Sequence, residues 1–405
     1  LVARDEISGR VARYDYDEVD NLISAEYERG GEVERLYRVS DRMGNLFETR
    51  ERDDRRYDAG GRLAEDREHF YHYDCEGNLV FKEFKEMVLH GGIVAPINKE
   101  RLETELGIRF RAFGTGWRYD WQSDGMLARV VRPDGKEVSF AYDALGRRIR
   151  KSFAGTTTQF VWDGNVPLHE WQEVAADAGK ADVTTWLFEQ NTFIPAAKLA
   201  ANGESFSIVS DYLGTPLQAF DNNGNKVWEQ ELDIFGRKKT GNNKSSFIPF
   251  KYQGQYEDVE TGLYYNRFRY YEPNTGTYIS QDPIGLVGGN PTLYAFVSDP
   301  NIWEDVFGLD CGRSGKQAKL RSLLDDPNTP KHVKGWIKQE LNSIFRKKRR
   351  TIRNPKGYEL AHKRGMETAK GFGYEHSNLQ LASLHRLQHK YDNFGRLNKR
   401  VKIKL

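Results

Sequence analysis

Cysteines and long apolar runs are both scarce in this chain of 405 residues. The only two cysteines, Cys75 and Cys311, lie far apart and outside any CxxC motif. The sequence therefore excludes a disulfide framework and argues against a metal site made of thiolates. No apolar run approaches the roughly 20 residues that a helix needs to span a bilayer. The longest candidate, residues 87–97, is short and contains glycine and proline.

An initiator methionine and a signal peptide are also missing, because the chain starts at Leu1 in the middle of a sequence pattern. We therefore expect a fragment of a longer protein whose targeting signals lie in another part.

Acidic residues are rare in the last quarter of the chain. Residues 310–405 contain 24 Lys and Arg against 8 Asp and Glu, a formal charge of +16, whereas residues 1–309 contain 37 against 51, a formal −14. This asymmetry predicts two domains, an acidic one over residues 1–309 and a basic one over residues 310–405. The charge of the basic domain favours a polyanionic partner such as nucleic acid.

The acidic part repeats a short block that has an aromatic residue, an Asp and then a turn with glycine. Alternating stretches such as residues 136–142 run between the blocks. This pattern predicts consecutive β-hairpins that bury a surface only against their neighbours. Examples of the block are Tyr57-Asp-Ala-Gly-Gly-Arg62, Tyr73-Asp-Cys-Glu-Gly-Asn78, Tyr142-Asp-Ala-Leu-Gly-Arg147, Phe220-Asp-Asn-Asn-Gly-Asn225 and Asp233-Ile-Phe-Gly-Arg237.

These blocks resemble the YD repeats of the Rhs family, which also occur in insecticidal Tc toxins and teneurins. Residues 262–286, which contain Leu-Tyr-Tyr-Asn-Arg-Phe-Arg-Tyr-Tyr and Tyr-Ile-Ser-Gln-Asp-Pro-Ile-Gly-Leu, resemble the core-associated sequence that ends the repeat array in that family. The resemblance implies a mainly β fold, a strip of hairpins that spirals into a hollow shell around the C-terminal domain. It also implies that the segment of about residues 262–309 is autoproteolytic.

Two related motifs flank the point where the composition changes, Asp282-Pro-Ile-Gly-Leu286 and Asp305-Val-Phe-Gly-Leu309. The family resemblance implies aspartyl-type cleavage of the bond between Leu309 and Asp310. Two carboxyl groups held close together can divide the roles of acid and base. We expect Asp282 and Asp305 to be this pair, with Asp299 as a third candidate.

Two residues here depart from the family pattern. Val306 stands where members commonly have Pro, and Gln281 stands where some members have Arg.

The basic domain begins with two predicted helices, over residues 316–324 and 330–345. In the second, the apolar residues fall on one stripe at helical spacing. A basic run follows it, and we expect several cations of the domain to contact phosphates. These are Arg346, Lys347, Lys348, Arg349, Arg350, Lys363, Arg364 and Arg396.

Five of the nine histidines lie in the basic domain. His385 and His389 are four residues apart in a helical pattern, so they project from one face and suit a divalent metal. His362 follows a short apolar stretch and is expected at the end of a strand, and Asn378 precedes the helix.

This order of residues resembles the ββα-metal fold of HNH nucleases, and its local details resemble the GH-E-type toxin nucleases. The resemblance implies an α+β domain in which His362 is the general base, Asn378 orients it and the helix binds a divalent ion. The expected ligands are His385 and His389, and Glu367 or Asp392 completes the set because Ala361 stands where many HNH sites carry a ligand. His385 is also a catalytic candidate. The ion is Mg, Mn, Ni or Zn.

The leading hypothesis is a secreted interbacterial toxin whose shell releases a metal-dependent DNase. The resemblance implies delivery by a secretion apparatus such as type VI, action in the target-cell cytoplasm and an acidic immunity protein as partner. One alternative is a metal-independent RNase on the same carrier. Another is an adhesion protein whose basic tail merely binds polyanions.

Overall fold

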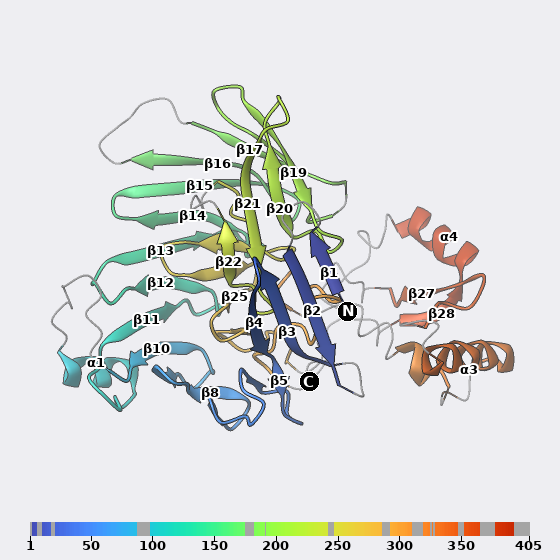
Figure 1. Ribbon diagram of the computed structural model, residues 1–405, viewed down its shortest axis with the longest axis horizontal. Helices are drawn as coiled ribbons and strands as arrows, with labels where there is room; N and C mark the ends of the chain where they lie inside the picture. Colours follow the sequence, from blue (N-terminus) through green and yellow to red (C-terminus); the bar gives the residue numbers. More distant parts are fainter. Residues whose placement is uncertain are drawn as a thin grey trace. The chain divides into compact units, whose positions relative to one another are not determined.

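A computed structural model describes residues 2–5, 10–17, 21–86, 98–174, 182–190, 192–241, 247–285, 292–309, 319–324, 326, 329–346, 352–364 and 377–392. The chain divides into two compact units (Figure 1). One comprises residues 1–283 and 290–308, and the other comprises residues 284–289 and 309–405.

The larger unit is built almost wholly from antiparallel strands, and within each of its sheets a strand pairs with the next along the chain. A first sheet has the order β1-β2-β3-β4, and a short pair, β5-β6, follows it. The bounds are β1 Val2–Asp5, β2 Arg10–Tyr16, β3 Leu22–Arg29, β4 Glu32–Tyr37, β5 Val39–Ser40 and β6 Leu46–Phe47.

A continuous strip of sixteen strands, β7 to β22, makes up most of the larger unit. The bounds are β7 Arg56–Asp58, β8 Arg62–Glu65, β9 His69–Tyr73, β10 Leu79–Phe84, β11 Gly116–Trp121, β12 Leu127–Val131, β13 Glu137–Tyr142, β14 Arg148–Phe153, β15 Thr156–Asp163, β16 Val166–Val174, β17 Thr184–Phe188, β18 Pro195–Leu199, β19 Ser205–Ser210, β20 Pro216–Phe220, β21 Lys226–Leu232 and β22 Lys238–Gly241. A short helix, α1 (Lys99–Leu106), lies between β10 and β11. The predicted succession of hairpins is confirmed.

In several of these turns the repeated Asp accepts the backbone N–H groups two and four residues further on. The Oδ1 atom of Asp143 accepts the N–H groups of Leu145 and Arg147, each at 2.9 Å, and its Oδ2 accepts the Nε–H of Arg147 at 2.6 Å. Burial raises the pKa of this carboxyl, but the hydrogen bonds from Arg147 outweigh burial and lower the pKa below its ordinary value. Gly146 has φ 72°, a conformation that favours glycine. Asp221 and Asp233 bind their turns in the same way.

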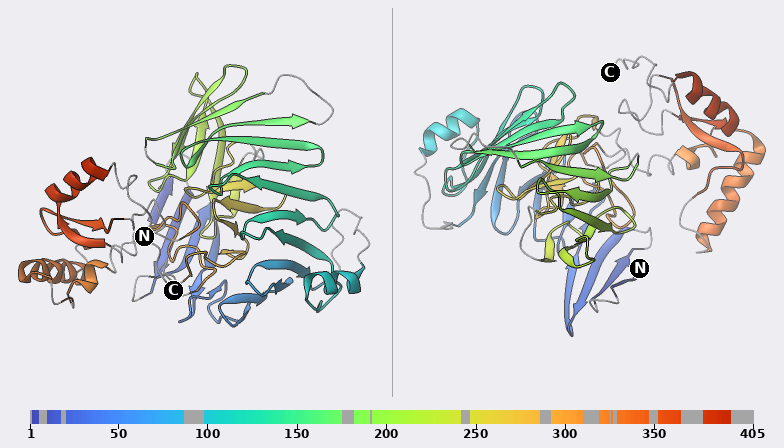
Figure 2. Two further views of the ribbon diagram at one scale, coloured as in Figure 1. Left: turned by 180° about the vertical axis from the view of Figure 1, so that it is seen from behind. Right: turned by 90° about the horizontal axis from the view of Figure 1, so that it is seen from above.

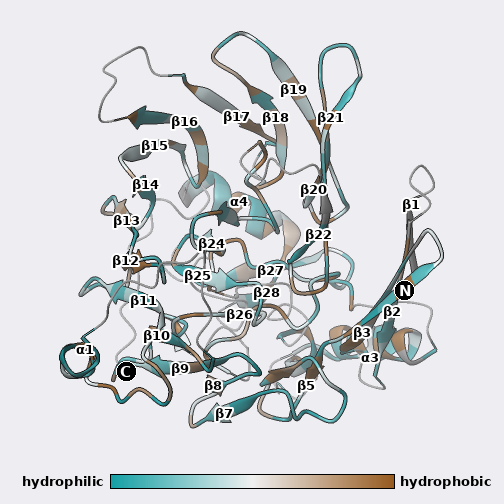
Figure 3. Ribbon diagram, turned by 60° about the vertical axis from the view of Figure 1, so that its left-hand side comes forward, coloured by the Kyte–Doolittle hydropathy of each residue, from teal (hydrophilic) through white to brown (hydrophobic). Residues whose placement is uncertain are grey.

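Residues 247–283 and 292–308 form an inner segment that packs against one face of the strip (Figure 2). It contains a four-stranded sheet, β23 (Tyr256–Asp258), β24 (Leu263–Asn266), β25 (Arg269–Glu272) and β26 (Thr277–Tyr278). Apolar residues alternate with polar ones along many strands of the strip (Figure 3). The strip therefore has one face that must be covered, and the inner segment covers it.

A buried cation fastens the strip to the inner segment. Arg148 of β14 is 1% exposed, and its Nη1 lies 2.5 Å from Oδ2 of Asp258 in β23. Lys151 lies 3.3 Å from the other oxygen of the same carboxylate. The ring of Tyr265 stands 4.4 Å from the Arg148 guanidinium. Burial of a charged side chain costs free energy that only a paired opposite charge offsets. The contact between Arg148 and Asp258 therefore fixes the position of the inner segment along the strip.

The smaller unit contains helix α3 (Lys331–Phe345), the hairpin β27 (Tyr358–His362) and β28 (Ser377–Leu381), and helix α4 (Ala382–Asp392). The predicted second helix is confirmed as α3. The part of the first predicted helix that the structure describes is helical over residues 319–322. Val333 and Ile337 of α3 pack with Leu360 of β27 in a buried cluster. None of the described helices is long and apolar enough to cross a membrane.

Replacement of the buried Asp258 is expected to destabilise the shell far more than replacement of an exposed Asp. Asp258→Asn leaves Arg148 without its ionic partner and should cost about 3–5 kcal/mol. Asp58→Asn removes an exposed pair with Arg56 and should cost less than about 1 kcal/mol. Urea denaturation followed by tryptophan fluorescence measures both. Equal shifts of the two midpoints would contradict the role assigned to Arg148.

Candidate functional sites

A buried arginine contacts both carboxylates of the predicted self-cleavage pair. Nη2 of Arg269, in β25, lies 2.9 Å from Oδ2 of Asp282 and 3.4 Å from Oδ2 of Asp305. The three side chains are 0%, 5% and 1% exposed. The structure therefore brings the predicted pair to one guanidinium. Arg269 thus supplies a positive charge beside the two carboxylates, where Gln281 supplies none.

Two further side chains position Asp305. The hydroxyl of Tyr278 donates to Oδ2 of Asp305 at 2.8 Å. Burial, with the charge of Asp305 as the next cause, raises the pKa of Tyr278 well above its usual range, so the hydroxyl remains a donor. Nδ2 of Asn266 donates to the Tyr278 hydroxyl and to the backbone carbonyl of Asp305, both at 2.7 Å.

The backbone that follows Asp305 is held close to β24 and β25. Nε of Arg269 donates to the carbonyl of Gly308, and the N–H of Phe268 donates to the carbonyl of Phe307 at 3.3 Å. Gly308 has φ 64°, and a Cβ there would lie 2.5 Å from the carbonyl oxygen of Asn266. Only glycine fits this position without a shift of the backbone. Asp310 lies outside the described residues, so cleavage of the bond from Leu309 to Asp310 stays a prediction.

The third carboxylate candidate, Asp299, is buried and closes a turn. Its Oδ1 accepts the N–H of Asn301 at 2.8 Å, and its backbone carbonyl accepts that of Trp303 at 2.9 Å. Turn chemistry thus accounts for an Asp at this position.

In the smaller unit the order of elements is strand, strand, helix. The hairpin pairs Ala361 with Asn378 and His362 with Ser377, so His362 ends β27 as predicted from the sequence. The helix α4 follows β28 directly and carries His385 and His389 on neighbouring turns. The N–H of Ala382 donates to the carbonyl of Gly357 at 2.9 Å, which ties the start of the helix to the start of the hairpin.

A carboxylate and two imidazoles meet between the hairpin and the helix. Nδ1 of His385 lies 2.7 Å from Oε2 of Glu359, and the rings of His385 and His389 have centroids 4.3 Å apart. Glu359 is 36% and His385 is 16% exposed, so the pair is within reach of solvent. A carboxylate that binds one ring nitrogen fixes the orientation of the imidazole, so that the other ring nitrogen points away from the carboxylate.

Strand alternation divides the predicted residues between the faces of the hairpin. Glu359 and Ala361 share one face of β27, and Leu360 and His362 share the other, because side chains alternate along a strand. Leu360 packs into the cluster with α3. His362 therefore belongs to the face of Leu360, at the last residue of the strand, and its role as general base stays a prediction.

Several predicted residues lie partly or wholly outside the description. Glu367, Lys347, Lys348, Arg349, Arg350 and Arg396 lie outside the described residues, and Asp392 is described only as the last residue of α4. The described cations of the predicted phosphate-binding set, Arg346, Lys363 and Arg364, are exposed.

A divalent ion fits the described donors only in part. Within the described ranges, no three His, Cys, Asp or Glu side chains form a group that could hold a metal. His385 and His389 offer two imidazoles, and the carboxylate on His385 is the usual companion of a histidine that binds metal. The remaining ligands would have to come from residues such as Glu367 and Asp392.

Sequence reasoning did not select Arg269, Tyr278 or Asn266 as site residues, and it noted Glu359 only as an acidic neighbour of His362 that suits metal binding or orientation of the base. Strand alternation could have indicated Glu359 as a site residue, because it places this side chain on the hairpin face that the following helix covers. Arg269 lies with Arg267 in a tyrosine-rich segment, and a buried cation in such a segment needs a carboxylate partner.

The fold and these sites together define a β-hairpin shell protein with an appended basic domain. Residues 13–287 match the family described as teneurin YD-shell, and residues 323–392 match the family described as bacterial toxin 8. The chain belongs to the YD-shell family, as the repeat blocks indicated. These matches, with the relatives below, support an Rhs polymorphic toxin at the level of shell plus toxin domain.

Two curated relatives are toxins of different printed activity. Double-stranded DNA deaminase toxin A of Burkholderia cenocepacia is 29% identical over 328 residues, which are 73% of this chain and 21% of the relative. Probable deoxyribonuclease RhsA of Dickeya dadantii is 28% identical over 256 residues, which are 62% of this chain and 16% of the relative. The chain thus spans about a fifth of their length.

Among solved structures, a crystal structure of TcdB2-TccC3 aligns with a TM-score of 0.45 and 18% identity. The alignment covers 76% of this chain and 17–18% of the solved chains of this kind.

Loss of the carboxylate beside His385 is expected to impair any chemistry of this site. Glu359→Gln keeps the size of the side chain but removes the charge, and it should lower the rate of plasmid cleavage by roughly 10–100-fold. His332→Ala, on an exposed face of α3, is the matched control and should leave the rate unchanged. Cleavage of supercoiled plasmid by the full chain measures both. An unaltered rate for Glu359→Gln would remove Glu359 from the site.

Proposed function

We propose that the basic domain is a toxin that hydrolyses phosphodiester bonds, with DNA as the favoured substrate. The observation that carries the proposal is the cluster of Glu359, His385 and His389 on a strand, strand, helix unit in a domain of formal charge +16. The match to a bacterial toxin family and the printed name deoxyribonuclease of a relative support it. An HNH-like site of the GH-E type is the arrangement that these residues fit best.

The proposed roles follow from the donors on each element. Glu359 accepts the Nδ1 proton of His385, which leaves the Nε2 lone pair of that imidazole available. A divalent ion held by His385 and His389 would supply positive charge at the scissile phosphate. His362 is the last residue of β27, where the chain leaves the strand, and from there it would take a proton from the attacking water, while Asn378, paired with Ala361 across the hairpin, would orient it. Exposed Lys363 and Arg364 neutralise flanking phosphates.

Chelation separates this proposal from its alternatives. The full chain is incubated with plasmid DNA and with tRNA, with Mg²⁺ or Mn²⁺ and with excess EDTA. We expect DNA cleavage that EDTA abolishes, because the two imidazoles alone cannot stabilise the leaving oxygen. RNA cleavage that persists in EDTA would identify the metal-independent RNase. Intact DNA and RNA under all conditions would leave only a binding or adhesion role.

We also propose that the larger unit cuts the chain after Leu309. One of the carboxylates Asp282 and Asp305 takes a proton from the water that attacks the carbonyl of Leu309, the other gives a proton to the leaving amine, and Arg269 stabilises the charge that remains. The bonds from Arg269 and Asn266 to the carbonyls of Gly308 and Asp305 hold the segment in one conformation before the reaction.

Asp305→Asn and Asp282→Asn are expected to keep the chain whole, because the amide cannot exchange the proton. Wild-type protein should instead show a fragment that starts at Asp310 by intact mass. Asp58→Asn, an exposed replacement, is the control and should cleave normally. Normal cleavage in both site variants, or wild-type protein that stays joined at Leu309, would refute this assignment.

The biological setting is proposed from the relatives. In this setting the shell would carry the toxin domain until delivery by a bacterial secretion system such as type VI, and the toxin would then act in the target-cell cytoplasm. An acidic immunity protein would protect the producing cell by covering the basic site.

A further inference from the structure

A lysine and a glutamine side chain meet in the interior of the larger unit. Lys251, at the start of the inner segment, is 0% exposed, and Gln230 of β21 is 4% exposed. Nζ of Lys251 donates to Oε1 of Gln230 at 3.1 Å. The same Nζ lies 2.8 Å from Oε2 of Glu257 in β23. An amine, an amide and a carboxylate therefore share one water-poor site.

The amide of Gln230 is fixed with its carbonyl toward the amine. Its Nε2 donates to the carbonyl of Pro216 at 2.7 Å and to the carbonyl of Phe250 at 3.1 Å. These two bonds use both protons of the amide and prevent it from flipping. The amide group is thus held beside the amine, with its oxygen 3.1 Å from Nζ, so that the two groups are neighbours in a fixed arrangement.

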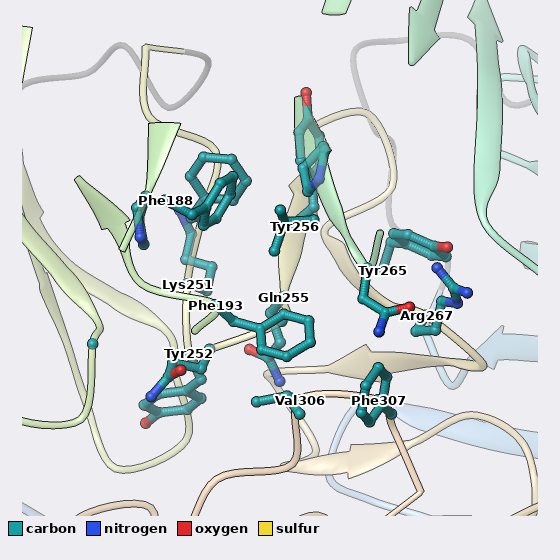
Figure 4. Close-up of a pocket in the computed structure, with 18 of the residues that line it drawn as sticks. Phe188, Phe193, Lys251, Tyr252, Gln255, Tyr256, Tyr265, Arg267, Val306 and Phe307 are labelled. Carbon is teal, nitrogen blue, oxygen red and sulfur yellow. The ribbon is translucent and has the colours of Figure 1, made fainter. Parts of the chain in front are cut away.

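The surroundings favour a neutral, nucleophilic amine. Figure 4 shows Lys251 among aromatic side chains, Phe188 and Tyr252 included, that line a cavity in this part of the unit. Burial lowers the pKa of Lys251 to about 8, although the charge of Glu257 opposes the change. Lys238, with Nζ 2.6 Å from the same Oε2 of Glu257, also disfavours a second ammonium. A desolvated lysine of this kind is an activated nucleophile.

We propose that Lys251 and Gln230 become joined by a spontaneous amide bond between Nζ and Cδ. The carboxylate of Glu257 takes a proton from the Lys251 ammonium, and the free amine attacks Cδ of Gln230. The bond from Cδ to Nε2 then breaks, and the leaving nitrogen receives the protons lost by Nζ and departs as ammonium. One ammonium side chain and one primary amide become one secondary amide and one ammonium ion, with no change of oxidation state.

The bond would join the strip to the inner segment covalently. Gln230 lies in β21, next to the edge strand β22, and Lys251 precedes β23 of the inner sheet. The linkage would close a loop that includes β22. It would also hold the last strands of the strip against the inner segment, which continues to Asp305. A closed loop of this kind restricts the unfolded chain in the way a disulfide does, in a protein that has almost no cysteine.

Peptide mapping of the full chain tests the proposal directly. A protease digest of wild-type protein should contain the peptide with Gln230 joined to the peptide with Lys251, at a mass about 17 Da below the sum of the two, because ammonia is lost. Fragmentation should place the link at these two side chains. Recovery of the two peptides separately, at their unmodified masses, would overturn the proposal without any variant.

Two lysine variants form a matched pair. Lys251→Arg keeps a cation beside Glu257 but should abolish the link, whereas Lys198→Arg should retain it. Lys198 is a suitable control because its Nζ donates to the carbonyl of Phe247 at 3.0 Å in the same part of the unit. Glu257→Gln should lower the linked fraction at least about tenfold, since proton transfer is lost. A link that survives Lys251→Arg, or full linkage in Glu257→Gln, would refute the assigned residues.

Discussion

Paired charges between the hairpin strip and the inner segment are the contacts on which the larger unit depends. A strip of hairpins has one apolar face and cannot bury it alone, so a second layer has to cover it. The pair of Arg148 and Asp258 fixes that layer near the middle of the strip. A second pair fixes it nearer the β7 end, where Lys82 of β10 lies 3.1 Å from Glu272 of β25. Each cation is expensive to bury and stable only opposite its carboxylate, so the pairs select one register.

The same principle brings the self-cleavage residues together. Arg269 is fully buried in β25, and its partners are the two carboxylates that flank the end of the repeat array. Tyr278 and Asn266 come from the adjacent strands and complete the polar surroundings of Asp305. The inner sheet thus covers the strip and also supports a reactive site. Both roles need buried hydrogen-bond donors, and the hydroxyls of its many tyrosines provide them.

The sequence predicted much of the fold because its signals are local. The repeated Asp and Gly define each turn through bonds to the next four residues, and the order of strands follows from short connections. Helix α1 was not expected, because it interrupts the repeats with a separate local signal, an Asn98 cap that accepts from the N–H of Arg101. Residues that act through long-range contacts were harder to find. The partners of Arg269 and Glu359 lie 13 to 36 positions away along the chain, beyond any spacing rule.

The ends that the full chain leaves on cleaved DNA give the most direct test of the proposed chemistry. The proposed reaction is an attack by water that His362 activates, at a phosphate where a divalent ion on His385 and His389 would supply positive charge. It predicts strand breaks with 5′-phosphate and 3′-hydroxyl ends, which a ligase can reseal. Intact strands that carry altered bases, or breaks confined to RNA with 2′,3′-cyclic phosphate ends, would contradict it.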